Sequence, residues 1–514
     1  MPSFCSPEAI PAANIRPPMS LRVYNTLSRQ KEPFETVQPN KVGIYLCGPT
    51  VYKPPHIGHL VGPVIFDTVK RYLVFRGYAV NWVVNVTDVD DKIIDEAGKR
   101  GIDFKTLAEE QTGLYLGILD RLGIKGQIDH LPKASEHMAE IIAMIHRLVD
   151  QGHAYYTPSG DVWFDTTSDA DYGKLANRRL EDQEAGLRDL AGSGKKHPAD
   201  FALWKAAKPA EPAWDSPWGR GRPGWHIECS AMSLRYLGET FDIHGGGDDL
   251  KFPHHENELA QSECCTGKPF VKYWMHNGLT KIRTKAASGE WKAEKMSKSL
   301  GNTIDAAGLL DQHGADTIRY LLLSTHYRSP IEFSEDALAS AKKSIGVFTR
   351  LLERVGALDA QHAQKPTPGM GWALEDAQKS DALSKPFVDK FTASMDDDFN
   401  TAGAIAALHE LTGAINGQIE KSNVEQTKDA ASIAIVSDAA TTLRKLAGLL
   451  GFTLQEEKKQ EDGLVEPLMQ LIIQLRQTAR KEKNFAMADA IRNGLTAIGV
   501  TLEDKKDGTI WRKG

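Results

Sequence analysis

The string HIGH at residues 56–59 follows a short apolar stretch at 42–46, and the string KMSKS stands far downstream at residues 295–299. In the first string, two imidazoles flank a glycine where a strand turns into a helix, so the backbone can approach a phosphate closely. In the second, two lysines stand beside serines, as in a loop that closes over a triphosphate and neutralises developing charge. Either string alone is a weak signal, but together and in this order they indicate nucleotide chemistry.

A second apolar stretch, 80–86, runs into the string NVTDVDD at residues 85–91, and helical sequence such as 66–75 stands between the two stretches. This alternation predicts a parallel α/β sheet. Ligands bind at the carboxyl ends of parallel strands. We therefore expect Cys47 and Thr87, which stand at the ends of the two predicted strands, to lie at the same edge of the sheet.

The order and content of HIGH and KMSKS resemble the signature of the class I aminoacyl-tRNA synthetases. Four further strings are similar to those of the cysteinyl-tRNA synthetase family: CGPTVY at 47–52, GWHIECS at 224–230, FDIHGGG at 241–247 and FPHHENE at 252–258. The resemblance covers nearly the whole chain from about residue 21. It implies an α/β fold in which a Rossmann-like parallel-sheet catalytic domain with an inserted subdomain is followed by an α-helical bundle and a small C-terminal anticodon-binding domain.

Composition along the chain sets the expected domain boundaries. Irregular polar sequence with the string GSG at 192–194 indicates an insertion, and a polar stretch rich in lysine and glutamate marks a linker. Alanine- and leucine-rich helices indicate a bundle, and the tail should form two helices and a strand-like end at 509–511. We expect a disordered N-terminal extension at 1–20, the first half of the catalytic domain at 21–134, a connective insertion at 135–222, the second half with the KMSKS loop and a stem-contact region at 223–335, the bundle at 336–454, the linker at 455–463 and the anticodon-binding domain at 464–514.

Bulk composition is that of a soluble globular chain. Of its 514 residues 41% are hydrophobic and 25% charged, and no apolar run is long enough to span a bilayer, so we expect no membrane association. The net charge of -6 does not favour nucleic acid, so any RNA site must be a local basic patch. Five cysteines, an odd number, favour a reduced compartment and thus the cytoplasm. The first twenty residues have neither the apolar core of a signal peptide nor the repeated arginines of a transit peptide.

Four residues are candidate metal ligands. His254 and Glu258 are spaced i, i+4 and so share one face of a helix expected to begin after Pro253. With Cys47 and Cys229 they would make a tetrahedral set of two thiolates, an imidazole and a carboxylate. Spacing alone favours a plainer interpretation, in which the cysteines are small buried apolar residues. All four match the zinc-ligand positions of the family, so the resemblance implies one Zn2+ per chain.

A metal would solve a recognition problem, because serine differs from cysteine by one atom. A purely apolar pocket separates near-isosteres by only about 10- to 200-fold. A zinc ion with an open position binds the substrate thiolate directly, and a proofreading domain then becomes unnecessary. Thr87 and Trp225 match family positions that line the amino-acid pocket, although an ordinary core role for a tryptophan competes with this interpretation.

The resemblance also implies the reaction. L-Cysteine and ATP would form cysteinyl-adenylate and pyrophosphate, and the cysteinyl group would then pass to the 3' end of tRNA(Cys). The chemistry needs positioning and charge neutralisation. We assign His56 and His59 to the phosphates and Lys295 and Lys298 to the pyrophosphate, with Mg2+ accompanying ATP. Nucleotide contacts by family position are Gly58, Gly245, Gly246, Gly247, Asp249 and Lys298, of which the three consecutive glycines and Asp249 form a ribose-side loop. His255 and Glu256 are expected to be structural neighbours of the metal site.

Basic residues gather in the tail. Trp511 could stack on an unpaired base, and the segment around it resembles the family's anticodon-binding tail. Interleaved acidic residues make a mixed solvated surface the competing interpretation for any single cation. The basic residues are Arg476, Arg480, Lys481, Lys483, Arg492, Arg512 and Lys513.

We expect the protein to be a monomer.

Three positions depart from the family pattern. LVGP follows at 60–63, where the family often has a small residue and an arginine, and Asp248 stands where serine is frequent. Asp95 replaces a second lysine of many relatives, which puts in doubt the pyridoxal-dependent persulfide activity of some family members.

Two other functions compete with tRNA charging. A ligase that transfers cysteine to a small amine, as in the mycothiol pathway, lacks a tail like 464–514. A non-catalytic descendant that binds zinc or RNA would be expected to lose the HIGH histidines and the KMSKS lysines, which are intact here.

Overall fold

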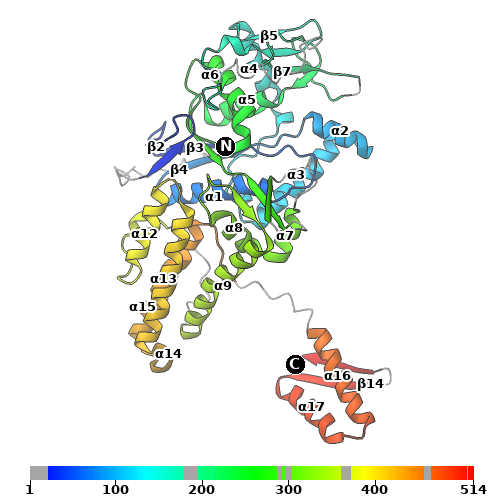
Figure 1. Cartoon of the computed structure of the whole chain (residues 1–514), viewed down its shortest axis with the longest axis vertical. Helices are drawn as coiled ribbons and strands as arrows, with labels where there is room; N and C mark the ends of the chain where they lie inside the picture. Colours follow the sequence, from blue (N-terminus) through cyan, green and yellow to red (C-terminus); the bar gives the residue numbers. More distant parts are fainter. Residues whose placement is uncertain are drawn as a thin grey trace, which may run out of the picture. The chain divides into compact units, whose positions relative to one another are not determined.

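The computed structural model describes residues 21–178, 194–209, 211–285, 291–295, 304–359, 372–455, 465–505 and 508–513. The chain forms two compact units that divide between Leu454 and Gln455 (Figure 1). The N-terminal extension expected at 1–20 lies outside the described residues. Within the described chain, no helix combines the length and the apolar character that a membrane crossing would need.

A parallel sheet forms the centre of the first unit, as the sequence predicts. Its strand order is β10-β9-β3-β4, with Ile44 of β3 opposite Ile243 of β9 and Leu46 of β3 opposite Val84 of β4. The strands are short, and β9 and β10 are almost wholly buried, as expected when both faces of a parallel sheet are covered. The strands are β3 (Lys41–Leu46), β4 (Ala79–Val84), β9 (Phe241–Gly247) and β10 (Val271–Asn277).

Alternate residues of β3 face two different cores. Ile44 and Leu46 belong to the core that includes helix α1 (Gly58–Phe75), whereas Tyr45 packs into the core that includes Ile227 of helix α5 (Trp225–Leu237). Helix α1 begins at the HIGH glycine, so it is longer than the helical stretch 66–75 that the sequence suggests. The other helices around the sheet are α2 (Asp91–Arg100), α3 (Phe104–Arg121), α5 (Trp225–Leu237) and α6 (Glu256–Thr266).

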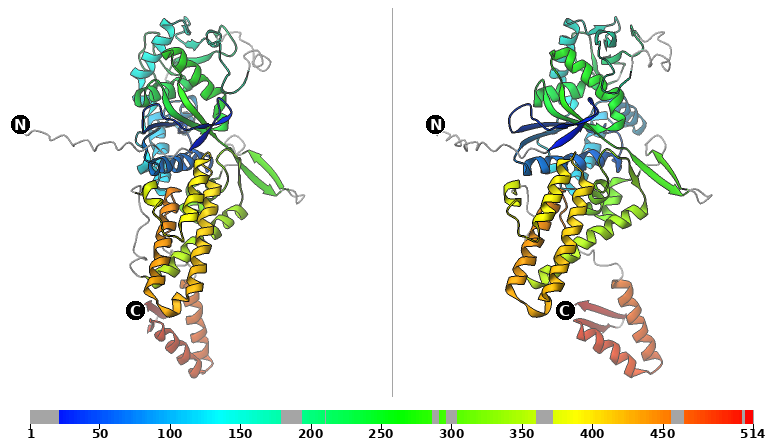
Figure 2. Two further views of the ribbon diagram at one scale, coloured as in Figure 1. Left: turned by 90° about the vertical axis from the view of Figure 1, so that its left-hand side faces the viewer. Right: turned by 60° about the vertical axis from the view of Figure 1, so that its left-hand side comes forward.

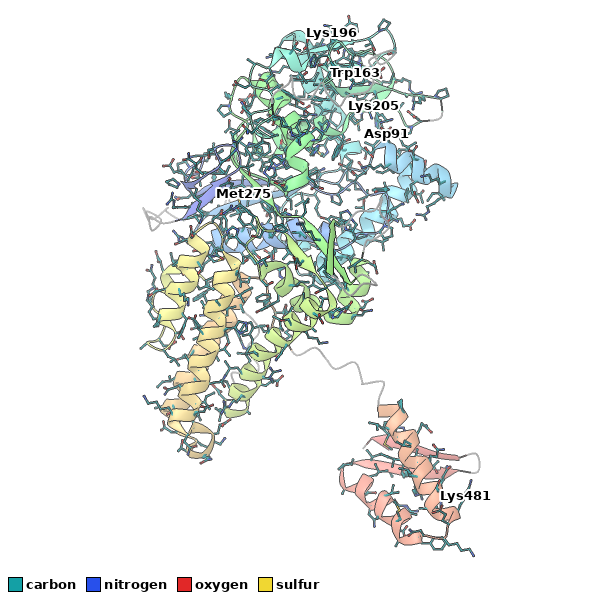
Figure 3. The ribbon with its side chains drawn as sticks, in the orientation of Figure 1. Asp91, Trp163, Lys196, Lys205, Met275 and Lys481 are labelled. Atoms are coloured by element: carbon teal, nitrogen blue, oxygen red, sulfur yellow. The ribbon has the colours of Figure 1, made fainter. Side chains whose placement is uncertain are left out.

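Between residues 135 and 222 the chain forms helix α4 (Met138–Asp150) and an antiparallel sheet of order β5-β6-β7-β8. The sequence interpretation, a helix with irregular polar sequence, missed this sheet because three of its strands have three residues each. Lys205 joins it to the region around the parallel sheet, since its Nζ lies 2.6 Å from Oδ2 of Asp91 in α2 (Figure 3). The strands are β5 (Ala154–Tyr156), β6 (Val162–Phe164), β7 (Phe201–Ala206) and β8 (Gly221–Pro223).

A second small sheet follows the parallel sheet along the chain. Strands β11 (Thr280–Lys285) and β12 (Trp291–Lys295) pair antiparallel and extend from the body as a hairpin, while β13 (Ile331–Phe333) pairs parallel with β11 (Figure 2). Helices α7 (Ala306–His313) and α8 (Ala315–Leu323) lie between β12 and β13 in sequence. At the start of the described chain, β1 (Arg22–Asn25) and β2 (Gln30–Pro33) form an antiparallel hairpin.

A helix bundle completes the first unit and confirms the predicted architecture. One apolar core runs from β3 through α1 into the bundle helices, and α1 lies between the sheet and the bundle (Figure 1). The parallel sheet and the bundle therefore share one continuous core. The bundle helices are α9 (Glu335–Leu358), α12 (Lys385–Asp396), α13 (Thr401–Ser422) and α15 (Ala430–Leu449), with the short helices α11 (Leu374–Ala377) and α14 (Val424–Thr427).

The second unit is small. It contains helices α16 (Val465–Lys481) and α17 (Phe485–Ala497), followed by an antiparallel hairpin of β14 (Val500–Lys505) and β15 (Gly508–Lys513). The two helices agree with the sequence interpretation. Strand β14 was not foreseen, because only 509–511 read as a strand.

Candidate active site and metal centre

Four side chains from separate elements meet at the carboxyl edge of the parallel sheet. Their ligand atoms all lie within 4.8 Å of one another: Cys47 just after β3, Cys229 in α5, His254 in a π-helical turn, and Glu258 in α6. The Cys47 Sγ is 3.8 Å from the Cys229 Sγ, 3.5 Å from the His254 Nε2 and 3.4 Å from the Glu258 Oε1. The structure thus brings together the four residues that the sequence suggests as metal ligands.

The local backbone at His254 differs from the expectation. His254 belongs to the π-helical turn Lys251–His255, and α6 begins only at Glu256. The i, i+4 spacing still brings the two side chains together, since His254 Nε2 lies 2.9 Å from Glu258 Oε1. The turn is irregular because Phe252 has the extended values φ -139° and ψ 133°.

Two further histidines orient the candidate ligands. His244 Nε2 lies 2.9 Å from Glu258 Oε2, so the other carboxylate oxygen is left to face Cys47 and His254. His226 Nδ1 lies 2.9 Å from His254 Nδ1, and burial followed by the charge of His254 holds the pKa of His226 well below its ordinary value. A neutral His226 accepts a hydrogen bond from the Nδ1–H of His254. The Nε2 of His254 then faces the other three candidate ligands. Sequence reasoning missed both histidines, although they stand within the quoted strings at 241–247 and 224–230.

The donor set fits a zinc ion. A hydrogen bond with Cys47 lowers the pKa of Cys229 to about 6, whereas burial raises the pKa of Cys47, so the first thiolate of the pair forms at Cys229. Burial alone would raise the pKa of Glu258, but the charges of His244 and His254 hold it well below its ordinary value. Sulfur, imidazole nitrogen and carboxylate oxygen directed at one buried point are the ligands that Zn2+ prefers.

The predicted substrate residues lie beside this cluster. The Trp225 ring stacks on the His254 ring at 4.2 Å and 17°. Thr87 is buried and donates to Glu228 Oε2 at 3.1 Å, while it accepts from Asn85 Nδ2 at 3.3 Å. Asn85 and Glu228 were not predicted, although both stand in the strings that pointed to their neighbours.

The HIGH residues form a compact turn at the start of α1. The rings of His56 and His59 stack at 3.9 Å, and His59 Nδ1 accepts from the His56 backbone N–H at 3.1 Å. A Cβ on Gly58 would lie 2.9 Å from His56 Cε1, so a larger residue here would displace the His56 ring. The Ile57 N–H donates to the Ile304 carbonyl at 3.2 Å. The described chain therefore returns to the HIGH turn directly after residues 296–303.

Of the KMSKS string, the structure describes only the backbone of Lys295. Lys295 is the last residue of β12, and its side chain is not described. Lys298 lies outside the described residues.

The three glycines expected in a ribose-side loop lie instead at the end of strand β9. Gly245, Gly246 and Gly247 pair with β10, and only Asp249 lies in the 3-10 turn that follows. A Cβ on Gly245 would lie 2.0 Å from the Phe66 ring of α1, and one on Gly246 would lie 2.6 Å from the His255 ring. Close packing on the strand, not turn conformation, explains the first two glycines.

In the second unit, Arg476 is not available to RNA. Its side chain is 1% exposed, and its guanidinium makes bonds of 2.7 and 2.8 Å to the two carboxylate oxygens of Asp504. Arg480 also contacts Asp504, at 3.0 Å. Trp511 is half-buried in β15 opposite Leu502. The predicted basic set thus includes cations that hold the unit together.

Comparison with known families covers most of the chain. Residues 33–343 match the model of the tRNA synthetases class I (C) catalytic domain, residues 390–455 a DALR domain, and residues 469–512 the cysteinyl-tRNA ligase anticodon binding domain.

Curated relatives and solved structures agree with these matches. A cysteine–tRNA ligase from Heliobacterium modesticaldum is 46% identical over 96% of this chain and 100% of the relative. One from Thermococcus onnurineus is 42% identical over 96% of this chain and 99% of the relative. Mycobacterium tuberculosis methionyl-tRNA synthetase, 15% identical, shares the fold with a TM-score of 0.58 over 81% of this chain and 92% of that chain.

The family matches span the catalytic domain and the tail, and the relatives match nearly from end to end. The chain belongs to the cysteinyl-tRNA synthetases, the class I aminoacyl-tRNA synthetases that charge tRNA(Cys) with cysteine.

Proposed function

We propose that this enzyme activates L-cysteine with ATP to cysteinyl-adenylate, selects the substrate through a zinc-bound thiolate, and then transfers the cysteinyl group to the 3' end of tRNA(Cys). The observation that carries the proposal is the convergence of Cys47, Cys229, His254 and Glu258 at the carboxyl edge of the sheet. Ligands of open α/β sheets bind at this edge.

The metal site selects the amino acid. When bound at these four residues, Zn2+ supplies a position for the sulfur of cysteine, which a serine hydroxyl fills only at a high cost of ionisation. His244 and His226 hold two of the ligands in the orientation that the site requires. Trp225 forms an apolar wall against His254, and Thr87 presents a hydroxyl fixed by Glu228.

The nucleotide site lies at the start of α1. His56, His59 and the backbone at Gly58 bind the phosphates, because the N-terminus of a helix favours anions. Lys295 and Lys298 neutralise the pyrophosphate as it leaves, and Mg2+ accompanies ATP as part of the substrate. The contact between Ile57 and Ile304 supports this assignment, since it ties the segment after KMSKS to the HIGH turn. The ribose of ATP binds at the end of β9 and the turn that follows it. The residues there are Gly245, Gly246, Gly247 and Asp249.

The attack itself asks for positioning. The cysteine carboxylate approaches the α-phosphorus in line with the departing pyrophosphate, so the residues that matter hold the two substrates and exclude water. The protein forms no covalent bond to the substrate in this scheme.

The domain assignment follows the sequence boundaries: a catalytic domain at 21–134 and 223–335, an insertion at 135–222, a bundle at 336–454, a linker at 455–463 and an anticodon-binding domain at 464–514. We also propose a cytoplasmic monomer. All four candidate ligands come from one chain, and the described cysteines are free thiols, as a reducing compartment would keep them.

One experiment separates the steps. The purified protein is analysed for zinc, then incubated with ATP, Mg2+ and labelled cysteine or serine, with and without deacylated tRNA. We expect cysteine-only ATP–pyrophosphate exchange and cysteine-only labelling of RNA. Exchange without labelled RNA would favour a small-amine ligase, and equal labelling by serine would contradict selection by the metal.

A further inference from the structure

Glu256 is the first residue of α6 and stands between His254 and Glu258, but its carboxylate binds the insertion. It accepts the backbone N–H groups of Gly173 at 3.0 Å and Leu175 at 3.4 Å on Oε1, and that of Ala176 at 2.7 Å on Oε2. The residue is 1% exposed. A buried carboxylate is tolerated where fixed donors replace water, so these three bonds explain why it can be there.

The segment 172–178, called the brace below, makes further contacts along α6. The Tyr172 hydroxyl donates to Asn257 Oδ1 at 2.5 Å, and Lys174 Nζ lies 2.6 Å from Glu263 Oε2. Tyr172 and Leu175 are buried in the same apolar core as Cys229. The brace thus packs against α6 and against the apolar core that contains Cys229, next to the candidate metal centre.

The turn inside the brace has a specific backbone requirement. Gly173 has φ +98°, and a Cβ there would lie 1.9 Å from the Arg178 carbonyl oxygen. The Arg178 N–H closes the turn by donating to the Gly173 carbonyl at 3.0 Å. The Arg178 guanidinium lies 4.4 Å from the centre of the Phe252 ring, so the brace also touches the turn that contains His254.

The turn Lys251–His255 is kinked at Phe252. Phe252 has extended backbone angles just before His254, while the Glu256 N–H donates back to the Lys251 and Pro253 carbonyls. His254 stands just after the kink and Glu258 lies one turn further along the chain, so a shift of the backbone at the kink would lengthen the 2.9 Å contact between His254 Nε2 and Glu258 Oε1. Glu256 is the residue at which the turn Lys251–His255 passes into α6, and its carboxylate is hydrogen-bonded to the brace.

We propose that Glu256 is a positioning residue: by binding the brace it fixes the junction between the π-helical turn and α6, and so sets the metal affinity and the preference for cysteine over serine. The inference rests on the proposed zinc site. Partners that orient metal ligands are typically worth about 10- to 100-fold in metal affinity. The connective insertion thereby acts on amino-acid selection without contacting the substrate.

Three full-length variants test this role. Glu256→Gln turns an amide N–H toward the backbone N–H groups, and Gly173→Ala disrupts the brace without changing α6. Lys174→Ala is the matched control, because it removes the partly exposed pair with Glu263 and keeps the three Glu256 bonds. We expect the first two variants to lose zinc to a competing chelator with about 10- to 100-fold weaker affinity.

Kinetics separates positioning from general damage. In the first two variants KM for cysteine should rise and discrimination against serine should fall, while KM for ATP stays unchanged. The double variant should be no worse than the more affected single variant, since both remove one interaction. Lys174→Ala should bind zinc as the wild type does.

A measurement on the wild type covers the case in which the variants unfold. Because coupling is reciprocal, removal of zinc should speed hydrogen exchange at the amides of Gly173, Leu175 and Ala176. Unchanged exchange there, or full zinc affinity in a folded Glu256→Gln, would overturn the inference. A wild type that binds no zinc would contradict the proposed function instead.

Discussion

Cys47 is the residue at which the sheet and the candidate metal site meet. It directly follows β3, and its backbone N–H donates to the Gly245 carbonyl of β9 at 3.2 Å, so the sheet fixes its position. The next residue is held as tightly, because a Cβ on Gly48 would lie 1.6 Å from the Asn85 carbonyl oxygen. The thiol therefore reaches the cluster from a backbone that has little freedom to move.

Replacing this thiol should remove the metal and spare the fold. Orienting partners alone are worth about 10- to 100-fold in metal affinity, so Cys47→Ser, which removes a ligand, should cost more than about 100-fold. Cysteine-dependent ATP–pyrophosphate exchange should fall with zinc content, while the circular dichroism spectrum stays that of the wild type. Cys264→Ser is the control, since this half-buried thiol is not part of the cluster. Normal zinc content in Cys47→Ser would refute the ligand assignment.

At the scale of elements, prediction succeeds where the signal is local. The runs that became β3 and α1 are visible as apolar patterns, and His254 and Glu258 show their partnership through i, i+4 spacing. The antiparallel sheet of the insertion has strands of three residues, too short for a period to appear. Gly245 is explained only by the approach of Phe66, which is a tertiary contact.

The same reasoning applies to the tail. Arg476 looks like any other cation in the sequence, and only the fold shows that it joins α16 to β14 through Asp504. Charge patterning therefore overestimated the basic surface at this position. A buried guanidinium with a bidentate carboxylate is a structural element, not an RNA contact.

This clamp should make the second unit sensitive to acid. Hydrogen bonds from Arg476 and Thr509, with the charges of Arg476 and Arg480, lower the pKa of Asp504 below its ordinary value. A lowered folded-state pKa contributes stability that is present above the unfolded pKa of about 4 and is lost as pH falls below it. Asp504→Asn should thus unfold at a lower temperature at pH 7, and its difference from the wild type should shrink as the pH is lowered. A difference that is constant from pH 7 to about pH 3 would exclude this charge effect.

At the scale of the first unit, three consecutive aspartates join the bundle to the catalytic domain. Asp396 accepts from the Tyr72 hydroxyl at 2.7 Å and contacts Arg76 at the end of α1. Asp398 accepts the Tyr24 backbone N–H, the Tyr327 hydroxyl and Arg328 Nε, each at 2.8 Å. Asp396 thus holds the bundle against the far end of the helix that begins with HIGH, and Asp398 ties it to β1 and to the segment after α8.

The buried Asp398 and the exposed Asp397 should contribute differently to the free energy of unfolding. Asp398→Asn keeps the size and suits the left-handed φ of +66°, but it removes a buried charge from three donors. We expect it to cost about 1 to 3 kcal/mol. Asp397 pairs with Lys31 on the surface, so Asp397→Asn should cost about 0 to 1 kcal/mol. Urea unfolding followed by tryptophan fluorescence measures both, and equal costs would contradict the assignment.

The division of the chain into two units makes a prediction about the whole enzyme. Every candidate metal ligand, the HIGH turn and the bundle lie before Leu454, whereas the segment that matches the anticodon binding domain lies at 469–512. In the proposed mechanism, adenylate formation uses only the first set of residues. A chain that ends at Gln460 should therefore keep cysteine-dependent ATP–pyrophosphate exchange within about threefold and lose about 100-fold in kcat/KM for tRNA, or about 2.7 kcal/mol.

The size of that loss follows from what the tail can supply. Stacking of a base on an aromatic ring is worth about 1 to 3 kcal/mol, so contacts to two or three anticodon bases account for it. Thermal unfolding of the shortened chain is the control, because a tail that merely stabilised the first unit would lower its midpoint and reduce exchange and charging together. Equal losses in the two reactions would assign the tail to stability. A selective loss of charging, restored by raising the tRNA concentration, would assign it to binding.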